Sequence, residues 1–193
     1  MRGEFKQWLI EIQEAALAHK REKALAAGDE SSWKRFIWTS TDKNKAIKDR
    51  FRDEGVQRGY RSRPSHETKA GQWLYDFVWR EFDENNNLLK VVLTMEIEVS
   101  ESKISSLLYD FHKLLQADSE YKVFVFQTKT EADVQAAMIA LKTAAQHYQS
   151  RSVSKYLLCG WSTQLNQFSF SNFEQETAPW TKPIHADAIT ELT

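Results

Sequence analysis

The chain has one cysteine, six glycines and three prolines in 193 residues. A lone cysteine, Cys159, can form neither an internal disulfide nor a cysteine-based zinc site. Its surroundings, YLLCGW, are typical of a buried strand and not of a thiol nucleophile. The scattered glycines cannot build a phosphate-binding loop, and the sequence contains no GxSxG, HExxH or HxH spacing. These absences exclude the enzyme classes that such short motifs identify.

The chain also lacks an excess of charge and a long apolar run. Lys and Arg together number 26 and Asp and Glu 27, so the net charge will not hold nucleic acid strongly. No stretch approaches the ~18 apolar residues of a membrane helix. The N-terminal residues form an acidic-basic amphipathic pattern unlike a signal peptide. We therefore expect a cytoplasmic protein that does not enter a membrane.

Aromatic residues are plentiful: seven Trp, eleven Phe and six Tyr. A chain of this length can bury roughly 70% of its unfolded surface, which suffices for a full core. Apolar spacing predicts helices and strands in alternation, which is typical of an α/β fold with a mixed central sheet flanked by helices. We expect an N-terminal helical extension, residues 1–40, packed on an α/β domain, residues 41–193.

The individual elements follow from periodicity and capping residues. Helices are predicted over 3–27, 43–58, 102–115 and 130–148, and strands over 121–128, 154–161 and 166–173. Residues 31–38 form either a second helix or a turn, residues 60–71 a loop, and the stretch from 176 onward is irregular. Expected helix caps are Thr41 or Asp42, Ser100 or Ser102, and Thr130 with Asp133.

Residues 73–99 predict a β-hairpin around the turn DENNN (83–87). Side chains alternate between faces along a strand, and the odd positions from 73 to 79 and from 89 to 99 are all apolar. The even positions carry three carboxylates, Asp76, Glu96 and Glu98. Pairing Phe82 with Leu88 puts Asp76 opposite Thr94 and diagonal to Glu96, within reach of a shared ion.

Three neighbouring carboxylates repel one another, and a hard divalent cation with oxygen ligands is one way to supply the counter-charge. The other interpretation is that these side chains point to water on the wet face of the hairpin. Leu74, Val78 and Val92 share that face, which argues against a plainly solvated one. The acids also stand directly before an amphipathic helix.

A basic segment precedes the hairpin: between residues 41 and 64 there are eight Lys or Arg and four Asp or Glu. Such a segment can contact a phosphodiester backbone. The candidate nucleic-acid-binding residues are Lys45, Lys48, Arg52 and Arg58. The same charges equally suit a solvated helix face.

Residues 44–128 resemble the PD-(D/E)xK nuclease superfamily, the restriction-endonuclease-like fold, whose core is a helix, a three-stranded meander, a helix and a strand. Asp76 in WLYDFVW takes the place of the family's Asp, and Glu96-Ile97-Glu98 in LTMEIEVS that of (D/E)-x-K. No Pro precedes Asp76, and Glu98 stands where the family has Lys.

Some superfamily members use a third carboxylate at that place, and others move the lysine onto the following helix. Lys103 and Lys113 are the candidates for a moved lysine. Helical phase favours Lys103, because Lys113 lies nearly opposite the apolar stripe of its helix. The run Asp110-Phe111-His112-Lys113-Leu114-Leu115, however, is similar to the family phrase D-F-x-K-L-L.

The resemblance implies a Mg²⁺- or Mn²⁺-dependent nuclease, a hydrolase acting on DNA or structured nucleic acid. Asp76, Glu96 and Glu98 would be metal ligands, and Glu98, Lys103 or Lys113 the catalytic residues. Glu54 would be an outer ligand or a solvated helix residue.

Two further possibilities stay open. One is a catalytically inactive member of the same fold that binds a protein partner as an accessory or immunity-like module, which the missing Lys and the near-neutral charge favour. The other is an unrelated α/β binding domain. Homodimerisation is also open.

Overall fold

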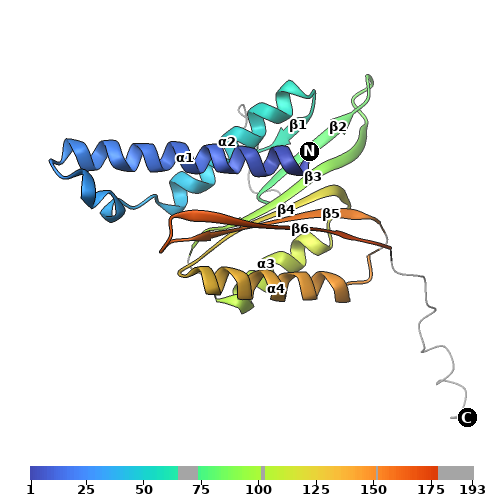
Figure 1. The fold of residues 1–193 in the computed structure, drawn as a ribbon. Helices are drawn as coiled ribbons and strands as arrows, with labels where there is room; N and C mark the ends of the chain where they lie inside the picture. Colours follow the sequence, from blue (N-terminus) through green and yellow to red (C-terminus); the bar gives the residue numbers. More distant parts are fainter. Residues whose placement is uncertain (65–73, 101–102, 151, 178–193) are drawn as a thin grey trace, which may run out of the picture.

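The structure is a computed structural model and describes residues 1–64, 74–100, 103–150 and 152–177. Within these ranges a six-stranded sheet lies between two layers of helices (Figure 1). The elements in chain order are α1 (Arg2–Ala26), the 3₁₀ helix η1 (Glu30–Arg35), α2 (Ser40–Gln57), β1 (Arg61–Arg63), β2 (Phe77–Phe82), β3 (Leu88–Glu98), α3 (Ile104–Leu115), β4 (Ser119–Thr128), α4 (Glu131–His147), β5 (Ser154–Ser162) and β6 (Gln167–Gln175). The predicted α/β class with a mixed sheet is confirmed.

The strands follow one another across the sheet in sequence order. Strands β1 to β3 form an antiparallel meander, β3, β4 and β5 are parallel, and β6 returns antiparallel to β5. Because β3, β4 and β5 run the same way, their C-terminal ends, Glu98, Thr128 and Ser162, meet at one edge of the sheet. We call this the site edge. The hydroxyl of Ser40 donates to the carbonyl of Val99 at 2.6 Å and so fastens the start of α2 there.

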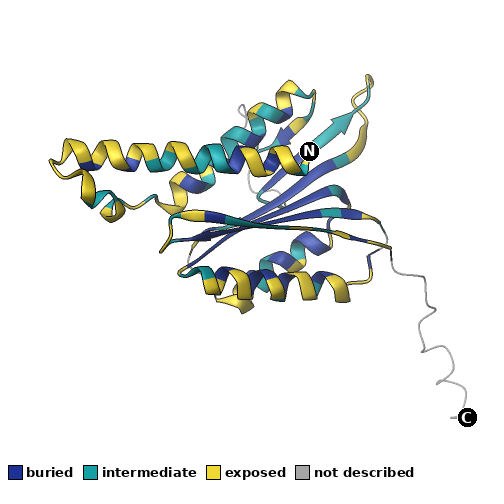
Figure 2. Ribbon diagram, viewed as in Figure 1, coloured by how far each residue is buried: buried dark blue, intermediate teal, exposed yellow. Residues whose placement is uncertain are grey.

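Each face of the sheet has its own apolar core (Figure 2). Toward α1 and α2, the rings of Phe5, Trp8 and Phe51 pack around the buried Trp79. The indole of Trp79 donates to the carbonyl of Phe51 at 2.9 Å, which satisfies the one polar atom of the cluster's central ring. Toward α3 and α4, apolar stripes of both helices cover Phe124, Phe126, Tyr156 and Leu158.

Helix α1 belongs to this core. Its Phe5 is fully buried between α2 and the sheet, and Gln13 accepts a hydrogen bond from the backbone of Phe168 in β6 at 2.7 Å. At its start, Arg2 reaches the carbonyl of Phe173 at 3.1 Å. The predicted division of the chain at residue 40 stays a prediction.

Most element bounds agree with the sequence to within a few residues, and the Thr130–Asp133 capping box is confirmed. The predicted loop over 60–71 is wrong at its start, because Arg61–Arg63 pairs with β2. Two cap predictions are also wrong. Thr39, and not Thr41 or Asp42, caps α2, and α3 begins after Lys103 without a side-chain cap. Trp73, Ser102 and the tail from 178 onward lie outside the described residues.

The predicted hairpin register holds only beside the turn, where Phe82 faces Leu88. Two register shifts in the β2–β3 pairing, at which β3 has one extra residue each, move the pairing, so that Val78 and not Asp76 faces Thr94. Each shift inserts a residue and re-aims the side chains that follow. As a result Val92 joins the core toward α1 whereas Leu89 is exposed. Asp76 itself lies in a bend directly before β2.

Gly55 of α2 tests the packing around Trp79. A Cβ at Gly55 would lie 2.4 Å from the Trp79 indole nitrogen, whereas a Cβ at Gly3 of α1 meets nothing within 4 Å. We expect Gly55→Ala to lower the free energy of unfolding by about 1–3 kcal/mol through overpacking. This loss should outweigh the ~1 kcal/mol that Ala gains in helix propensity. Gly3→Ala is the matched control in urea unfolding, and equal stability of the two variants would contradict this packing.

Candidate functional site

The site edge brings two of the predicted carboxylates together. The Asp76 carboxylate accepts a hydrogen bond from the backbone N–H of Ile97 at 3.0 Å, which places it beside the peptide that follows Glu96. Its other oxygen lies 3.1 Å from the ammonium of Lys48 in α2. The bend before β2 therefore holds Asp76 against the end of β3, although Asp76 is not part of a strand.

Glu96 is the most unusual residue of the site because its carboxylate is buried, with only 3% of the residue exposed. One oxygen, Oε2, lies 3.1 Å from the ammonium of Lys113, and the other, Oε1, has no hydrogen-bond partner among the residues that the structure describes. Burial raises the pKa of Glu96 to about 7, the neighbouring charge of Asp76 adds to this, and Lys113 opposes it. Lys113 therefore compensates only part of the cost of burying the charged Glu96 carboxylate.

Lys113 reaches this carboxylate from the flank of α3, where it also pairs with Asp110 at 2.9 Å. The pKa of its ammonium is raised: burial lowers it, but the hydrogen bonds to Asp110 and Glu96 outweigh that effect. Helical phase favoured Lys103 over Lys113, but it is Lys113 that contacts Glu96. The apolar stripe of α3 faces β4 and α4, so a long side chain well off the stripe spans the gap to β3. Lys103 is exposed at the N-cap.

Glu98 lies apart from this pair. It is half-buried at the end of β3, and its carboxylate accepts hydrogen bonds from the backbone N–H of Ser100, at 3.0 Å, and from the Ser100 hydroxyl. Glu98 lines an open hollow of about 480 Å³ together with Lys45 and the first turn of α2. It is therefore accessible to a ligand at the site edge.

The arrangement can be compared with what a divalent cation requires. Among residues 1–64, 74–100, 103–150 and 152–177, no three His, Cys, Asp or Glu side chains are gathered as a ready-made ligand set. Mg²⁺ is, however, often held by only one or two carboxylates together with water and substrate oxygens. The unpartnered Oε1 of buried Glu96, beside Asp76, suits such a cation in oxygen chemistry and in charge.

The predicted nucleic-acid-binding residues are all engaged in ion pairs. Lys45 contacts Asp49 at 2.5 Å, Arg52 also pairs with Asp49, and Lys48 holds Asp76. Of these side chains, Lys45 and Lys48 lie near the site edge, because Lys45 lines the hollow beside Glu98 and Lys48 contacts Asp76. Whether any of them contacts nucleic acid stays a prediction.

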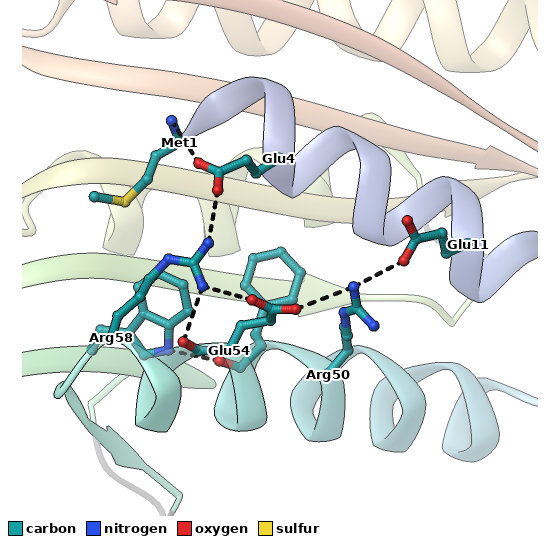
Figure 3. A network of polar contacts seen from close by, with 8 residues as sticks. Met1, Glu4, Glu11, Arg50, Glu54 and Arg58 are labelled. Carbon is teal, nitrogen blue, oxygen red and sulfur yellow. Dashed lines mark hydrogen bonds and ion pairs between the residues drawn. The ribbon is translucent and has the colours of Figure 1, made fainter.

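Arg58 belongs to a different network, which fastens α2 to α1 (Figure 3). It contacts Glu54 at 2.6 Å and Glu4 at 2.7 Å, while Arg50 links Glu54 with Glu11. The guanidinium of Arg58 also stacks over the ring of Trp8. Glu54, a candidate outer ligand or solvated helix residue, is thus held by two arginines.

Sequence reasoning missed a second group of charges near the site edge, the buried Lys20 of α1 and Lys43 of α2. One signal was present. Lys43 stands four residues before Ile47, on the buried stripe of its helix, where an apolar residue is expected.

Comparison of the chain with family models, with curated proteins and with solved structures finds no match. The restriction-endonuclease-like core therefore stays a prediction from the residues that resemble it. In the part of the chain that the structure describes, no helix has the length and apolar character needed to cross a membrane.

The raised pKa of Glu96 makes stability depend on pH. Between about pH 4.5 and pH 7 the unfolded chain releases the Glu96 proton and the folded chain retains it, so the folded state loses stability as the pH rises. We expect wild type to lose stability relative to Glu96→Gln over this window by up to ~3 kcal/mol, at about 1.4 kcal/mol per pKa unit. Above pH 7 the difference should be constant.

Urea unfolding at a series of pH values measures this difference. Glu84→Gln, in the exposed hairpin turn, controls for the loss of one carboxylate. A constant difference between wild type and Glu96→Gln from pH 4.5 to pH 7 would show that Glu96 is not buried as described.

Proposed function

We propose that this protein is a metal-dependent nuclease that hydrolyses phosphodiester bonds at the site edge. The observation that supports the proposal most is the buried Glu96 carboxylate, which has an unpartnered oxygen and lies beside Asp76 and Lys113. The order α2, β1 to β3, α3, β4 is also the helix, meander, helix and strand that the resemblance implies.

The chemistry divides between the cation and the chain. A divalent cation supplies Lewis-acid stabilisation of the charge that develops on the phosphate. Asp76 and Glu96 would hold it through hard carboxylate oxygens. Lys113, whose raised pKa keeps it protonated, acts as a fixed positive charge and hydrogen-bond donor and not as a base. Glu98, accessible in the hollow, is placed to accept a proton from an attacking water.

Lys48 and Lys113 also neutralise the site before substrate arrives. Each carboxylate has one lysine at 3.1 Å, so a phosphate entering the site edge meets paired charges and not a bare anion cluster. With a cation at the carboxylates, Lys48 would be able to turn toward the phosphate oxygens, while Lys113 would keep its ion pair with Asp110.

A non-catalytic, protein-binding member of the same fold is the second candidate. The observation that favours it is the ion pairing of Lys45, Arg52 and Arg58 within the molecule, which leaves little unpaired positive charge for nucleic acid on α2. The two candidates differ in whether the carboxylates bind a cation.

Cation binding is the first test. Mg²⁺ or Mn²⁺ at a hundredfold excess over Kd stabilises a protein by about 2.7 kcal/mol. We expect the melting temperature of wild type to rise accordingly and that of Glu96→Gln and Asp76→Asn not to rise. Glu84→Gln should respond like wild type. Equal responses of all four proteins would contradict a cation site at Asp76 and Glu96.

Cleavage is the second test. With Mn²⁺, wild type should nick plasmid DNA or cut single-stranded DNA, and Asp76→Asn should lose this activity, because the cation loses a carboxylate ligand. Lys113→Met should lose activity while it still binds Mn²⁺, because Lys113 is not a ligand. A cation-dependent rise in melting temperature without cleavage of any nucleic acid would favour the protein-binding candidate.

A further inference from the structure

A second cavity lies beside the site edge, between the α1–α2 connection and the ends of β4 and β5. It measures about 160 Å³, the space of roughly five water molecules at ~30 Å³ each. Its walls include Trp38 and Trp161, and its polar lining includes Lys20, Lys43 and Gln127. Ser40 lines both this cavity and the hollow beside Glu98, so the two are neighbours.

The two lysines are buried without an acidic partner. Lys20 is 5% and Lys43 3% exposed. Their ammonium groups donate to neutral acceptors only, Lys20 to the side-chain oxygen of Asn166 at 2.5 Å and Lys43 to the carbonyl of Trp38 at 2.6 Å. Neither forms an ion pair with a carboxylate of the residues that the structure describes. A buried charge without a counter-charge is costly.

The two cations also act on each other. Burial lowers the pKa of Lys43 to about 8, the charge of Lys20 lowers it further, and Asp42 offsets only part of this. Burial likewise lowers the pKa of Lys20. A fold that held these side chains only for packing would gain by replacing either with an apolar residue of the same length. Their arrangement suits an anion that brings two negative charges.

Aromatic rings enclose the ammonium groups. Lys43 lies 5.3 Å from the ring centre of Trp38 and 5.6 Å from that of Trp161, and Lys20 lies 5.2 Å from that of Trp33. Trp38 and Trp161 meet edge to face at 5.1 Å. At the mouth, Ile37 is 82% exposed and Lys34 adds a further positive charge. The cavity therefore combines a cationic floor with an apolar rim.

Gln127 completes the polar lining. It is 7% exposed, and its side-chain oxygen has no hydrogen-bond partner. Since an amide can present either its oxygen or its NH₂ group, Gln127 can donate to an anion in the cavity. The first turn of α2, which carries Ser40 and Lys43, adds the positive end of a helix dipole.

From this geometry we propose that the cavity binds a phosphate monoester, with Lys20 and Lys43 as the phosphate-binding residues and the apolar rim around Ile37 against the group that carries the phosphate. A phosphate dianion matches the two ammonium charges, and its several oxygens can accept from both lysines and from Gln127. The proposal does not depend on the nuclease function, since phosphate binding requires neither Asp76 nor Glu96.

The test is the melting temperature of the full chain in inorganic phosphate against chloride at equal ionic strength. At a hundredfold excess over Kd we expect a rise of about 5–10 °C for wild type. Lys43→Met and Lys20→Met keep the length of the side chain and should lose the rise. Lys142→Met, on the exposed side of α4, should retain it. Equal rises in all four proteins, or none in wild type, would overturn the proposal.

A second readout uses wild type alone and so does not depend on folding of the variants. In an NMR titration with phosphate, the indole N–H signals of Trp38 and Trp161 should shift and those of the distant Trp8 and Trp79 should not. Acetate at the same ionic strength should leave all four unchanged. Equal shifts with acetate would assign the cavity to carboxylates and contradict the choice of phosphate.

The source of the phosphate is distinguished by two pairs of probes. A nucleoside monophosphate is compared with its nucleoside, and a 5′-phosphorylated oligonucleotide with its 5′-hydroxyl form. If the nucleoside monophosphate binds more tightly than the nucleoside, the ligand is a small molecule. If the 5′-phosphorylated oligonucleotide binds more tightly than the 5′-hydroxyl form, the ligand is a nucleic-acid end. Failure of both phosphate members to bind better than their controls would overturn the proposal.

Discussion

Burial of the Glu96 carboxylate between the end of β3 and the flank of α3 is the constraint on which the site depends. A carboxylate removed from water favours its neutral form, and Lys113 only partly restores the charged one. The apolar stripe of α3 covers β4 and leaves this flank free, and so the topology creates the place where an acid can be buried but not fully paired. Asp76, fixed by the backbone of Ile97, adds a second negative charge to the same place.

The site edge gathers charges of both signs from elements far apart in the chain. Parallel β3, β4 and β5 end there, and α2 begins there. Two acid–lysine pairs lie at the end of β3, and two lysines without acidic partners lie at the ends of β4 and β5. Buried charges of this kind lower stability, and proteins tolerate that cost mostly at functional sites. The same edge that would hold a cation at its acids can therefore hold an anion at its lysines.

Local patterns were enough to predict the layered α/β fold and most element bounds. They placed Asp76, Glu96 and Glu98 on one face of the hairpin but did not decide whether that face is buried. They were not enough for features that depend on distant contacts. The two register shifts between β2 and β3 gave Thr94 the partner Val78 in place of Asp76, and no local signal marks such a shift. Lys113 was a candidate only through the similarity of a short phrase, whereas helical phase favoured Lys103, because phase describes the helix and not the distance that a lysine can span. Lys20 and Lys43 meet only through the folding of α1 over α2.

The most direct measurement of the central claim is the titration of the Glu96 carboxyl carbon by NMR, with and without Mg²⁺. This account predicts a midpoint near pH 7 without the cation. With Mg²⁺ the midpoint should move to lower pH, because the cation binds the ionised carboxylate. A midpoint near 4.5 that Mg²⁺ leaves unchanged would contradict both the burial of Glu96 and its part in a cation site.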